Sequence, residues 1–315
     1  MTLKSEPQAL AQNTKWRDFR RRFKRERQLW ISCIPIIAWV VVFAYVPMYG
    51  ILQAFVNYIP GKEIWECKWM GFTYFEQFFR SPDFGNVMRN TLAISLLGLV
   101  VGFPAPIVLA LLLNELGSVK LKRAVQTISY LPYFISWVVV ANILFTMLGN
   151  EGLVNEVLRA LGVKPVSFLG EGKYFWAVLT LTNVWKGVGW SSIIYLSAIA
   201  GIDQELYQAG TVDGLGRFGL IWHITLPGIR TTVVLLLILS IGGILNAGFE
   251  QQLLIGNPQT REYYEVIDTY AYKYGIQMGR YSYGTAIGLF KSVIGLGLVL
   301  GANAFAKRAM DVAIF

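Results

Sequence analysis

Long apolar runs alternate with shorter polar segments along most of the chain. Six runs contain almost no charged residue, and they cover approximately residues 30–55, 90–114, 125–149, 174–201, 231–256 and 284–306. A helix needs roughly 20 apolar residues to cross a bilayer. The runs are continuously apolar and do not alternate as lipid-facing strands do. The pattern therefore predicts an all-α membrane protein with six transmembrane helices.

Composition supports a membrane location. Of the 315 residues, 55% are hydrophobic and only 15% are charged, and the mean hydropathy is +0.48. This is too apolar for a soluble domain of this length. We predict a basic amino-terminal segment, 1–29, followed by one transmembrane domain, 30–315.

Basic residues indicate the orientation of the spans. A cluster of them lies directly before the first run, namely Lys15, Arg17, Arg20, Arg21, Arg22, Lys24, Arg25 and Arg27. Cytoplasmic segments carry an excess of Lys and Arg, so we predict that both termini are cytoplasmic and that the loops 56–89, 150–173 and 257–283 are external. A basic run beside a span is typical of a topology signal that contacts anionic membrane lipid, and we expect no nucleic-acid partner.

Several kinds of chemistry lack the residues they require. The chain contains no G-x-x-x-x-G-K-[ST] phosphate loop, so it has no ATPase site of its own. His223 is the single histidine, which excludes a Ser-His-Asp arrangement in the membrane and gives no ligand cluster for a metal. Cys33 and Cys67 fall on different levels of the predicted membrane and predict no disulfide. We expect a chain that is not an enzyme and that binds no metal or cofactor.

The most informative polar segment is 208–227, which reads QAGTVDGLGRFGLIWHITLP between two apolar runs. A polar, glycine-punctuated loop of this kind indicates a docking element. It resembles the signature with which permease subunits of ABC importers engage their ATPase. The positions that match in type and order are Ala209, Asp213, Gly214, Ile224, Leu226 and Pro227. Gln208 and Gly210 depart from it, because the family usually has Glu and Ala there.

Further segments resemble carbohydrate-importer permeases. They are 86–91, 102–106, 110–115, 129–137 and 288–292, and the resemblance covers nearly the whole chain from about Trp30 onward. They are most similar to the polysaccharide-type, LplB-like branch, which is related to the larger permease of maltose importers. Importers of alginate or another acidic oligosaccharide belong to this branch. The resemblance implies a type I ABC importer permease fold in the bacterial cytoplasmic membrane.

The resemblance also implies partners and a coupling mechanism. This chain would work with a second homologous permease, two ATP-binding subunits that hold ATP and Mg, and an extracytoplasmic solute-binding protein. Within a coupling loop, 202–230, residues 203–217 would form a short helix that lies along the membrane and fits a cleft of the ATPase. The residues implied in coupling are Asp203, Glu205, Gln208, Ala209, Gly210, Asp213, Gly214, Leu226 and Pro227.

Two helical faces are candidates for the substrate path. Asn183, Lys186, Gly187 and Trp190 fall at i, i+3, i+4 and i+7 in the fourth run, and Asn246 and Glu250 fall at i and i+4 in the fifth. By resemblance, the maltose-type permease binds sugar at or close to most of these positions. Lys186 is either a contact for an acidic sugar or a snorkelling residue, and Trp190 is either a substrate contact or a packing aromatic.

Charged side chains inside a span are costly, about 2.5–3.5 kcal/mol each on insertion scales. Glu250 and Lys291 lie at similar depths in their runs. This favours a structural ion pair between them, and a place for Glu250 on the substrate path is the alternative.

Two other transport classes remain to be compared. An ion-coupled secondary transporter of a polar solute would also contain several spans with charge inside them, but it needs ion-site carboxylates there, and only Glu250 qualifies. A channel subunit needs a selectivity sequence, which the loop 257–283 does not contain. A permease subunit of an ATP-driven importer is therefore the favoured function.

Overall fold

The computed structural model describes residues 26–310, which divide into two compact units at Gln53. The described part of the first unit is an apolar helical segment built from α2 (Arg27–Val40), the π-helical η1 (Val41–Tyr45) and most of the 3-10 helical η2 (Val46–Phe55). The basic cluster before Glu26 lies outside the described residues. Arg27, the last member of that cluster, begins α2.

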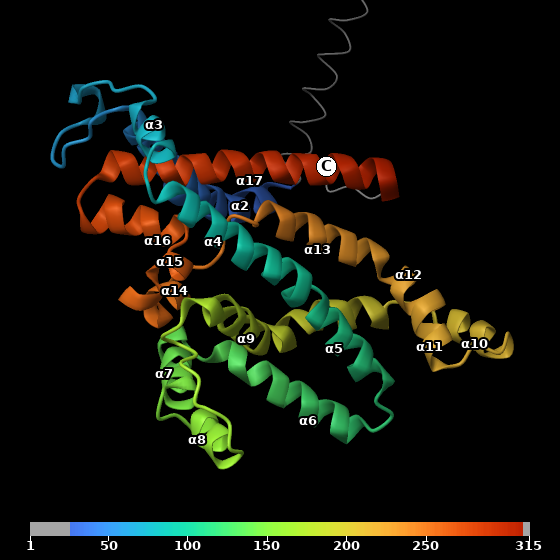
Figure 1. Ribbon diagram of the computed structural model, residues 1–315. Coiled ribbons are helices and arrows are strands. Elements are labelled where there is room, and N and C mark those ends of the chain that lie inside the picture. The colour runs from blue at the N-terminus through green and yellow to red at the C-terminus, as the bar shows by residue number, and fades with distance from the viewer. Residues whose placement is uncertain (1–25, 311–315) are drawn as a thin grey trace, which may run out of the picture. The chain divides into compact units, whose positions relative to one another are not determined.

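The second unit, from Ala54 onward, is also helical (Figure 1). Its long helices and their extensions are α4 (Phe84–Leu97), η4 (Gly98–Gly102), α5 (Pro104–Glu115), α6 (Val119–Tyr130), η5 (Leu131–Phe134), α7 (Trp137–Leu148), α9 (Gly172–Ala200), α13 (Arg230–Gly242) and α17 (Tyr281–Met310). Its shorter elements are η3 (Ile64–Glu66), α3 (Thr73–Phe79), α8 (Leu153–Ala160), α10 (Gln204–Val212), α11 (Arg217–Leu220), η6 (Ile221–Thr225), α12 (Leu226–Gly228), α14 (Glu250–Ile255), η7 (Pro258–Thr260), α15 (Arg261–Tyr264), α16 (Ile267–Tyr272) and η8 (Lys273–Gln277).

Length and hydropathy identify the helices that are able to cross a membrane. In the described part of the chain they are 27–55, 84–115, 137–160 and 281–308, together with the pair 217–228 and 230–242, which is bent by 61°. The helix α9 has 29 residues and is also long enough, but it carries Asn183, Lys186 and several hydroxyl side chains that lower its hydropathy. This arrangement is compatible with the predicted six spans.

Two predicted spans are not continuous helices. The third is interrupted after α6 by η5, where Pro132 cannot donate a backbone hydrogen bond. The fifth ends at Gly242 and resumes at Glu250 as α14. Between them Gly248 adopts a positive φ of 99°, which side chains other than glycine rarely tolerate. The apolar runs are therefore helical for most of their length, but two of them contain a break.

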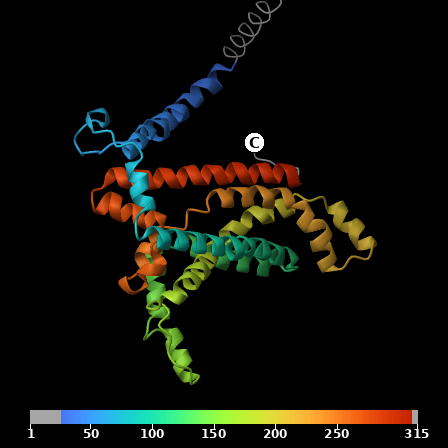
Figure 2. The ribbon, with the colours of Figure 1, turned by 45° about the horizontal axis from the view of Figure 1, so that its top comes forward.

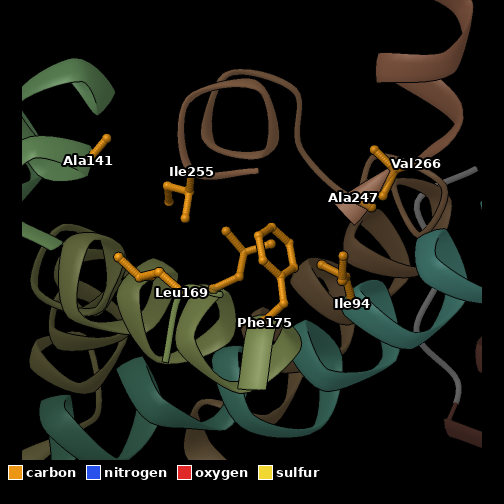
Figure 3. Packing of buried hydrophobic residues seen from close by; sticks show 8 residues of the cluster. Ile94, Ala141, Leu169, Phe175, Ala247, Ile255 and Val266 are labelled. Atoms are coloured by element: carbon orange, nitrogen blue, oxygen red, sulfur yellow. The ribbon is translucent and has the colours of Figure 1, made fainter. Parts of the chain in front are cut away.

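The helix α9 contributes to two clusters of the hydrophobic core. Phe175 and Leu179 of α9 pack with Ile94 of α4, Ile255 of α14 and Val266 (Figure 3). Near the other end of α9, a second cluster joins Tyr195 and Ile199 to Ala110 of α5. Contact along its length fixes α9 between its neighbours, which positions its polar side chains.

Loops from three parts of the sequence join at one end of this unit, near α14–α16, whereas α10 and α11 lie at the opposite end (Figures 1 and 2). Asn90 Nδ2 donates to the carbonyls of Glu262 (2.8 Å) and Glu265 (3.0 Å), and Asn257 Nδ2 donates to that of Leu169 (2.7 Å). The loops that the charge pattern assigns to the outer side therefore form a single cap.

Candidate functional site

A cavity of about 460 Å³ lies among the second, fourth and fifth predicted spans. Asn183 and Gly187 line it from α9, and Asn246 lines it from the break after α13. Gly98 and Gly102 of η4 form part of the opposite wall. The structure thus brings together three candidate residues that come from two different runs of the sequence.

Two hydroxyl groups at this cavity lack a hydrogen-bond partner among the described residues. They are Ser95 Oγ of α4 and Thr180 Oγ1 of α9. Thr180 is only 6% exposed. A buried hydroxyl without a partner costs free energy, so this cavity suits a ligand that offers donors and acceptors. Both residues are missing from the sequence predictions. The signal for Thr180 is its spacing, since Thr180, Asn183, Gly187 and Ser191 form one polar stripe on α9.

Asn246 and Glu250 do not share a helical face. Asn246 belongs to the non-helical break and Glu250 is the first residue of α14. The predicted i, i+4 arrangement is therefore wrong, although Asn246 lines the central cavity. Gly242, which the same face would include, packs closely against Val299 of α17.

Lys186 directs its ammonium group to the break between α6 and α7. Its Nζ donates to the carbonyl oxygens of Pro132 (3.3 Å), Tyr133 (2.7 Å) and Ile135 (2.6 Å). The ammonium group also lies 5.6 Å and 5.7 Å from the ring centres of Tyr133 and Trp137. The Pro132 carbonyl also accepts from the backbone N–H of Ile135 (3.2 Å). At this interruption of the helix, Lys186 supplies a donor to all three carbonyls instead of snorkelling to the surface.

A second cavity of about 430 Å³ adjoins the first, because Asn183 and Gly187 line both. Lys186, Glu250 and Trp137 complete much of its wall. Lys186 and Glu250, which the sequence places in different runs, thus line the same cavity. Trp190 does not line either cavity. Its ring stacks on Tyr133 at 4.8 Å and meets Phe134 edge-on at 5.6 Å, which makes it a packing aromatic at the break.

Lys291 has a different partner from the one that its depth suggests. Its Nζ forms a hydrogen-bonded salt bridge with Asp268 Oδ1, and both side chains are partly buried. Asp268 belongs to α16, in the loop that returns over the end of α17. The predicted Glu250–Lys291 ion pair is therefore wrong, because the loop supplies a carboxylate that the run lengths do not reveal.

The segment expected to couple folds as a helical hairpin. Asp203 caps α10 by accepting a hydrogen bond from the backbone N–H of Glu205 at 2.9 Å. The hydroxyl of Tyr207 lies 3.0 Å from that of Thr225, which ties α10 to η6. Gly210 is buried against Ile224, and a Cβ built there would lie 2.7 Å from its Cδ1. This close packing suits a glycine at position 210.

The tip of this hairpin depends on Gly214. Its φ is +83°, the left-handed region that glycine adopts at low cost, and the turn lets α11 begin at Arg217. Glu205, Gln208, Ala209 and Asp213 are exposed. The hairpin also exposes large apolar side chains, with Val212 86% and Phe218 88% accessible. Leu226 and Pro227 begin α12, after which the chain bends into α13.

Metal ligands do not gather anywhere in residues 26–310. No group of three His, Cys, Asp or Glu side chains there is arranged to hold an ion. His223 is exposed on η6. Neither cavity therefore presents a metal centre in the described chain.

Comparison with known proteins adds a family to this geometry. Residues 102–311 match the family model described as binding-protein-dependent transport system inner membrane component. Protein LplB of Bacillus subtilis is 44% identical over 93% of this chain and 92% of its own length. The polygalacturonan/rhamnogalacturonan transport system permease protein YteP of the same organism is 41% identical, over 92% of this chain and 91% of its own.

A solved structure gives the same result for the fold. It is the crystal structure of a bacterial alginate ABC transporter in complex with a periplasmic protein that holds an alginate pentasaccharide, and one chain of it matches with a TM-score of 0.86 and 40% identity. The match covers 93% of this chain and 99% of that chain. These similarities favour the importer permease over the ion-coupled transporter. The chain belongs to the family of binding-protein-dependent transport system inner membrane components, the permeases of ABC importers.

Proposed function

We propose that this chain forms one half of the translocation path for an acidic oligosaccharide. The observation that carries the proposal is the central cavity, where the amides of Asn183 and Asn246 lie with the unpartnered hydroxyls of Ser95 and Thr180. Amide and hydroxyl groups suit the hydroxyls of a sugar, since both can donate and accept hydrogen bonds. Relatives named for polygalacturonan and alginate transport support the acidic class.

Lys186 and Glu250 have supporting roles in this proposal. The Lys186 ammonium group donates its hydrogen bonds to three carbonyls, so it does not bind a sugar carboxylate. Its role is to shape the cavity wall beside Asn183 and Gly187. Glu250 stands on the adjoining cavity, where its negative charge balances that of Lys186. Trp190 holds the break against α9.

The hairpin from Asp203 to Pro227 would carry the movement of an ATPase into the spans. Two ATP-binding subunits hold ATP and Mg, a second permease completes the path, and an extracytoplasmic binding protein delivers the sugar. Both termini lie in the cytoplasm in this arrangement. The exposed apolar residues Val212 and Phe218 suit burial in a cleft of the ATPase, and closure of the two ATPases then alternates access to the cavity.

The test is uptake by the full importer, reconstituted in proteoliposomes with these partners. We expect accumulation of labelled trigalacturonate that requires ATP and the binding protein and that persists when ionophores collapse ion gradients. Gly214→Val should abolish the stimulation of ATP hydrolysis by substrate, because valine is strained at a positive φ. Gly216→Val is the matched control, since Gly216 has an extended backbone with open space around it.

Uptake that needs an ion gradient and not ATP would contradict the importer mechanism. Equal stimulation in the Gly214→Val complex would contradict the coupling role of the hairpin. Accumulation of neutral maltotriose with exclusion of trigalacturonate would contradict the acidic class alone.

A further inference from the structure

A third cavity, of about 760 Å³, lies in the cap that the loops form at the start of α17. We name it the tyrosine–arginine pocket after six of its lining residues, Gln77, Arg80, Asp83, Tyr274, Arg280 and Tyr283. None of its lining residues also lines the central cavity. It is therefore a separate hollow, between α3 and the start of α17, on the side opposite the coupling hairpin.

Tyrosine side chains form the rigid floor of this pocket. The hydroxyl of Tyr270 lies 2.9 Å from that of Ser81 and 3.1 Å from that of Tyr283. Tyr274 packs on Tyr270 with ring centres 4.5 Å apart. Burial raises the pKa of Tyr270, so its hydroxyl stays protonated. The pocket thus has a neutral, polar and aromatic wall that is held by its own contacts.

Arg280 is held in one position at the rim. Its guanidinium carbon lies 4.4 Å from the ring centre of Tyr283, and its Nη2 donates to Gln77 Oε1 at 3.0 Å. A guanidinium has five N–H donors in a planar fork, so this hydrogen bond leaves most of them for a ligand. Arg80 lines the same pocket and pairs with Glu76 at 2.6 Å on an exposed surface. Two arginines thus line the pocket, and a guanidinium is able to bind a carboxylate in a bidentate manner.

The remaining groups suit the hydroxyls of a sugar. Asp83 Oδ2 accepts from the hydroxyl of Tyr274 at 3.3 Å, and Arg261 lies 3.6 Å from the same oxygen. The carboxylate is therefore oriented at the pocket wall, where it accepts hydrogen bonds from a polyol. Gln77 adds a planar amide. Carboxylate, amide, guanidinium and aromatic faces in one hollow match a ligand that has hydroxyls, a carboxylate and an apolar ring face.

We propose that the tyrosine–arginine pocket is a second saccharide site, which binds a uronate unit of the acidic oligosaccharide outside the translocation path. The inference rests on the proposed function for its ligand class. Arg280 and Arg80 bind the uronate carboxylate, Asp83 and Gln77 bind ring hydroxyls, and the tyrosines form the apolar wall. An oligosaccharide longer than the central cavity would be held by one of its units at this site.

The experiment is titration calorimetry on the assembled, nucleotide-free importer in phosphatidylcholine nanodiscs, without binding protein. The probes are trigalacturonate and its carboxyl-reduced analogue. We expect Arg280→Gln to weaken one trigalacturonate binding event about tenfold and to change binding of the reduced analogue less than twofold. Asn183→Ala, in the central cavity, should leave that event unchanged. Arg159→Gln is the control for charge, because Arg159 pairs with Glu151 elsewhere on the cap.

The outcomes separate the two proposals. If Arg280→Gln does not assemble, Arg80→Gln decides, since its side chain is 80% exposed and its loss leaves the fold intact. If both arginine variants bind trigalacturonate with wild-type affinity, the pocket is not a saccharide site. The proposed function still holds in that case if the wild-type importer takes up the saccharide. If this trigalacturonate binding event is lost in phosphatidylglycerol nanodiscs, the pocket binds a lipid phosphate and the saccharide site is overturned. Absence of any saccharide uptake by the wild type would instead refute the proposed function.

Discussion

Lys186 is a charged residue inside a predicted span. The free-energy cost of placing its charge there is offset by hydrogen bonds to the backbone. Three carbonyl oxygens at the η5 break surround its ammonium group, and two aromatic rings lie close to it. The three hydrogens of an ammonium group match three acceptors. Lys186 therefore contributes to the site by fixing the break against α9.

For Lys186→Met we expect a loss of stability and an equal loss of transport for acidic and neutral sugars. A carbonyl left without a donor in apolar surroundings costs about 1–3 kcal/mol, and the loss falls on Tyr133 and Ile135, because Pro132 keeps the backbone N–H of Ile135. Thermal unfolding of the complex and uptake of trigalacturonate and its reduced analogue would measure both effects. A loss confined to the acidic sugar would show instead that Lys186 binds its carboxylate. Lys186→Arg, which keeps the charge and the donors, should recover part of the stability.

The Lys291–Asp268 salt bridge predicts coupling between two substitutions. Lys291→Met and Asp268→Asn should each destabilise the complex, and the double variant should lose less than their sum, because removing one partner strands the other charge. The coupling should be about 0.5–3 kcal/mol. The matched cycle of Lys291→Met with Glu250→Gln should be additive. Additivity in the first cycle, measured by chemical unfolding, would refute the pair.

Residue positions were predictable where helical spacing alone decides them. Asn183 and Gly187 share a face of an unbroken α9, and both line the central cavity. The partner of Lys291 was not predictable, because Asp268 reaches it only after the loop 257–283 folds back over α17. Thr180 was open to prediction from spacing, but its single hydroxyl gives a weak signal in an apolar run.

At the scale of elements, the approach of α9 to α6 depends on a missing side chain. A Cβ built at Gly189 would overlap the backbone of Ser129 and Tyr130, whereas a Cβ at Gly187 meets nothing within 4 Å. The two glycines are two residues apart in one helix but have opposite surroundings. Gly189 permits helix packing, and Gly187 leaves space in the cavities.

We therefore expect Gly189→Ala to reduce folding and assembly, because backbone atoms cannot move aside as a flexible side chain does. Overpacking of this kind costs about 1–3 kcal/mol. Gly187→Ala should assemble normally and reduce saccharide uptake, since its methyl group narrows both cavities. Size-exclusion chromatography and uptake assays would compare them. Normal assembly of Gly189→Ala would contradict the close contact.

The helices were predictable from the sequence where a run of high hydropathy marks them. All six apolar runs contain helix. The breaks were missed because hydropathy does not distinguish a helix from an unwound apolar segment. Pro132 and the glycines around Asn246 were the available signals, yet a proline inside an apolar run is also compatible with a kinked helix.

At the scale of the molecule, the two proposed sites outside the spans lie at opposite ends of the second unit. The cap contains the tyrosine–arginine pocket, and the coupling hairpin lies at the far end (Figure 2). The central cavity is lined by the spans between them. Charge placement in the sequence predicts which loops share a side, and the hydrogen bonds between those loops agree with it.

Cysteine labelling of whole cells would measure the orientation. In a background of Cys33→Ser and Cys67→Ser, Leu161→Cys should react with an impermeant maleimide, because Leu161 is 71% exposed at the end of α8 in a loop assigned to the outside. Val212→Cys, on the coupling hairpin, should react only after the membrane is permeabilised. The reverse pattern would place both termini outside.

The cap is joined in part by side chains that bond to backbone carbonyls. Asn90 bonds to the carbonyls of residues 262 and 265, and Asn257 bonds to that of residue 169. Every residue type presents the same carbonyl, so the identities at the accepting positions are free to vary while the two asparagines persist. Substitutions can therefore accumulate on the outer surface without loosening the architecture. A permease built in this way is able to acquire new saccharide preferences during evolution while its inner machinery stays constant.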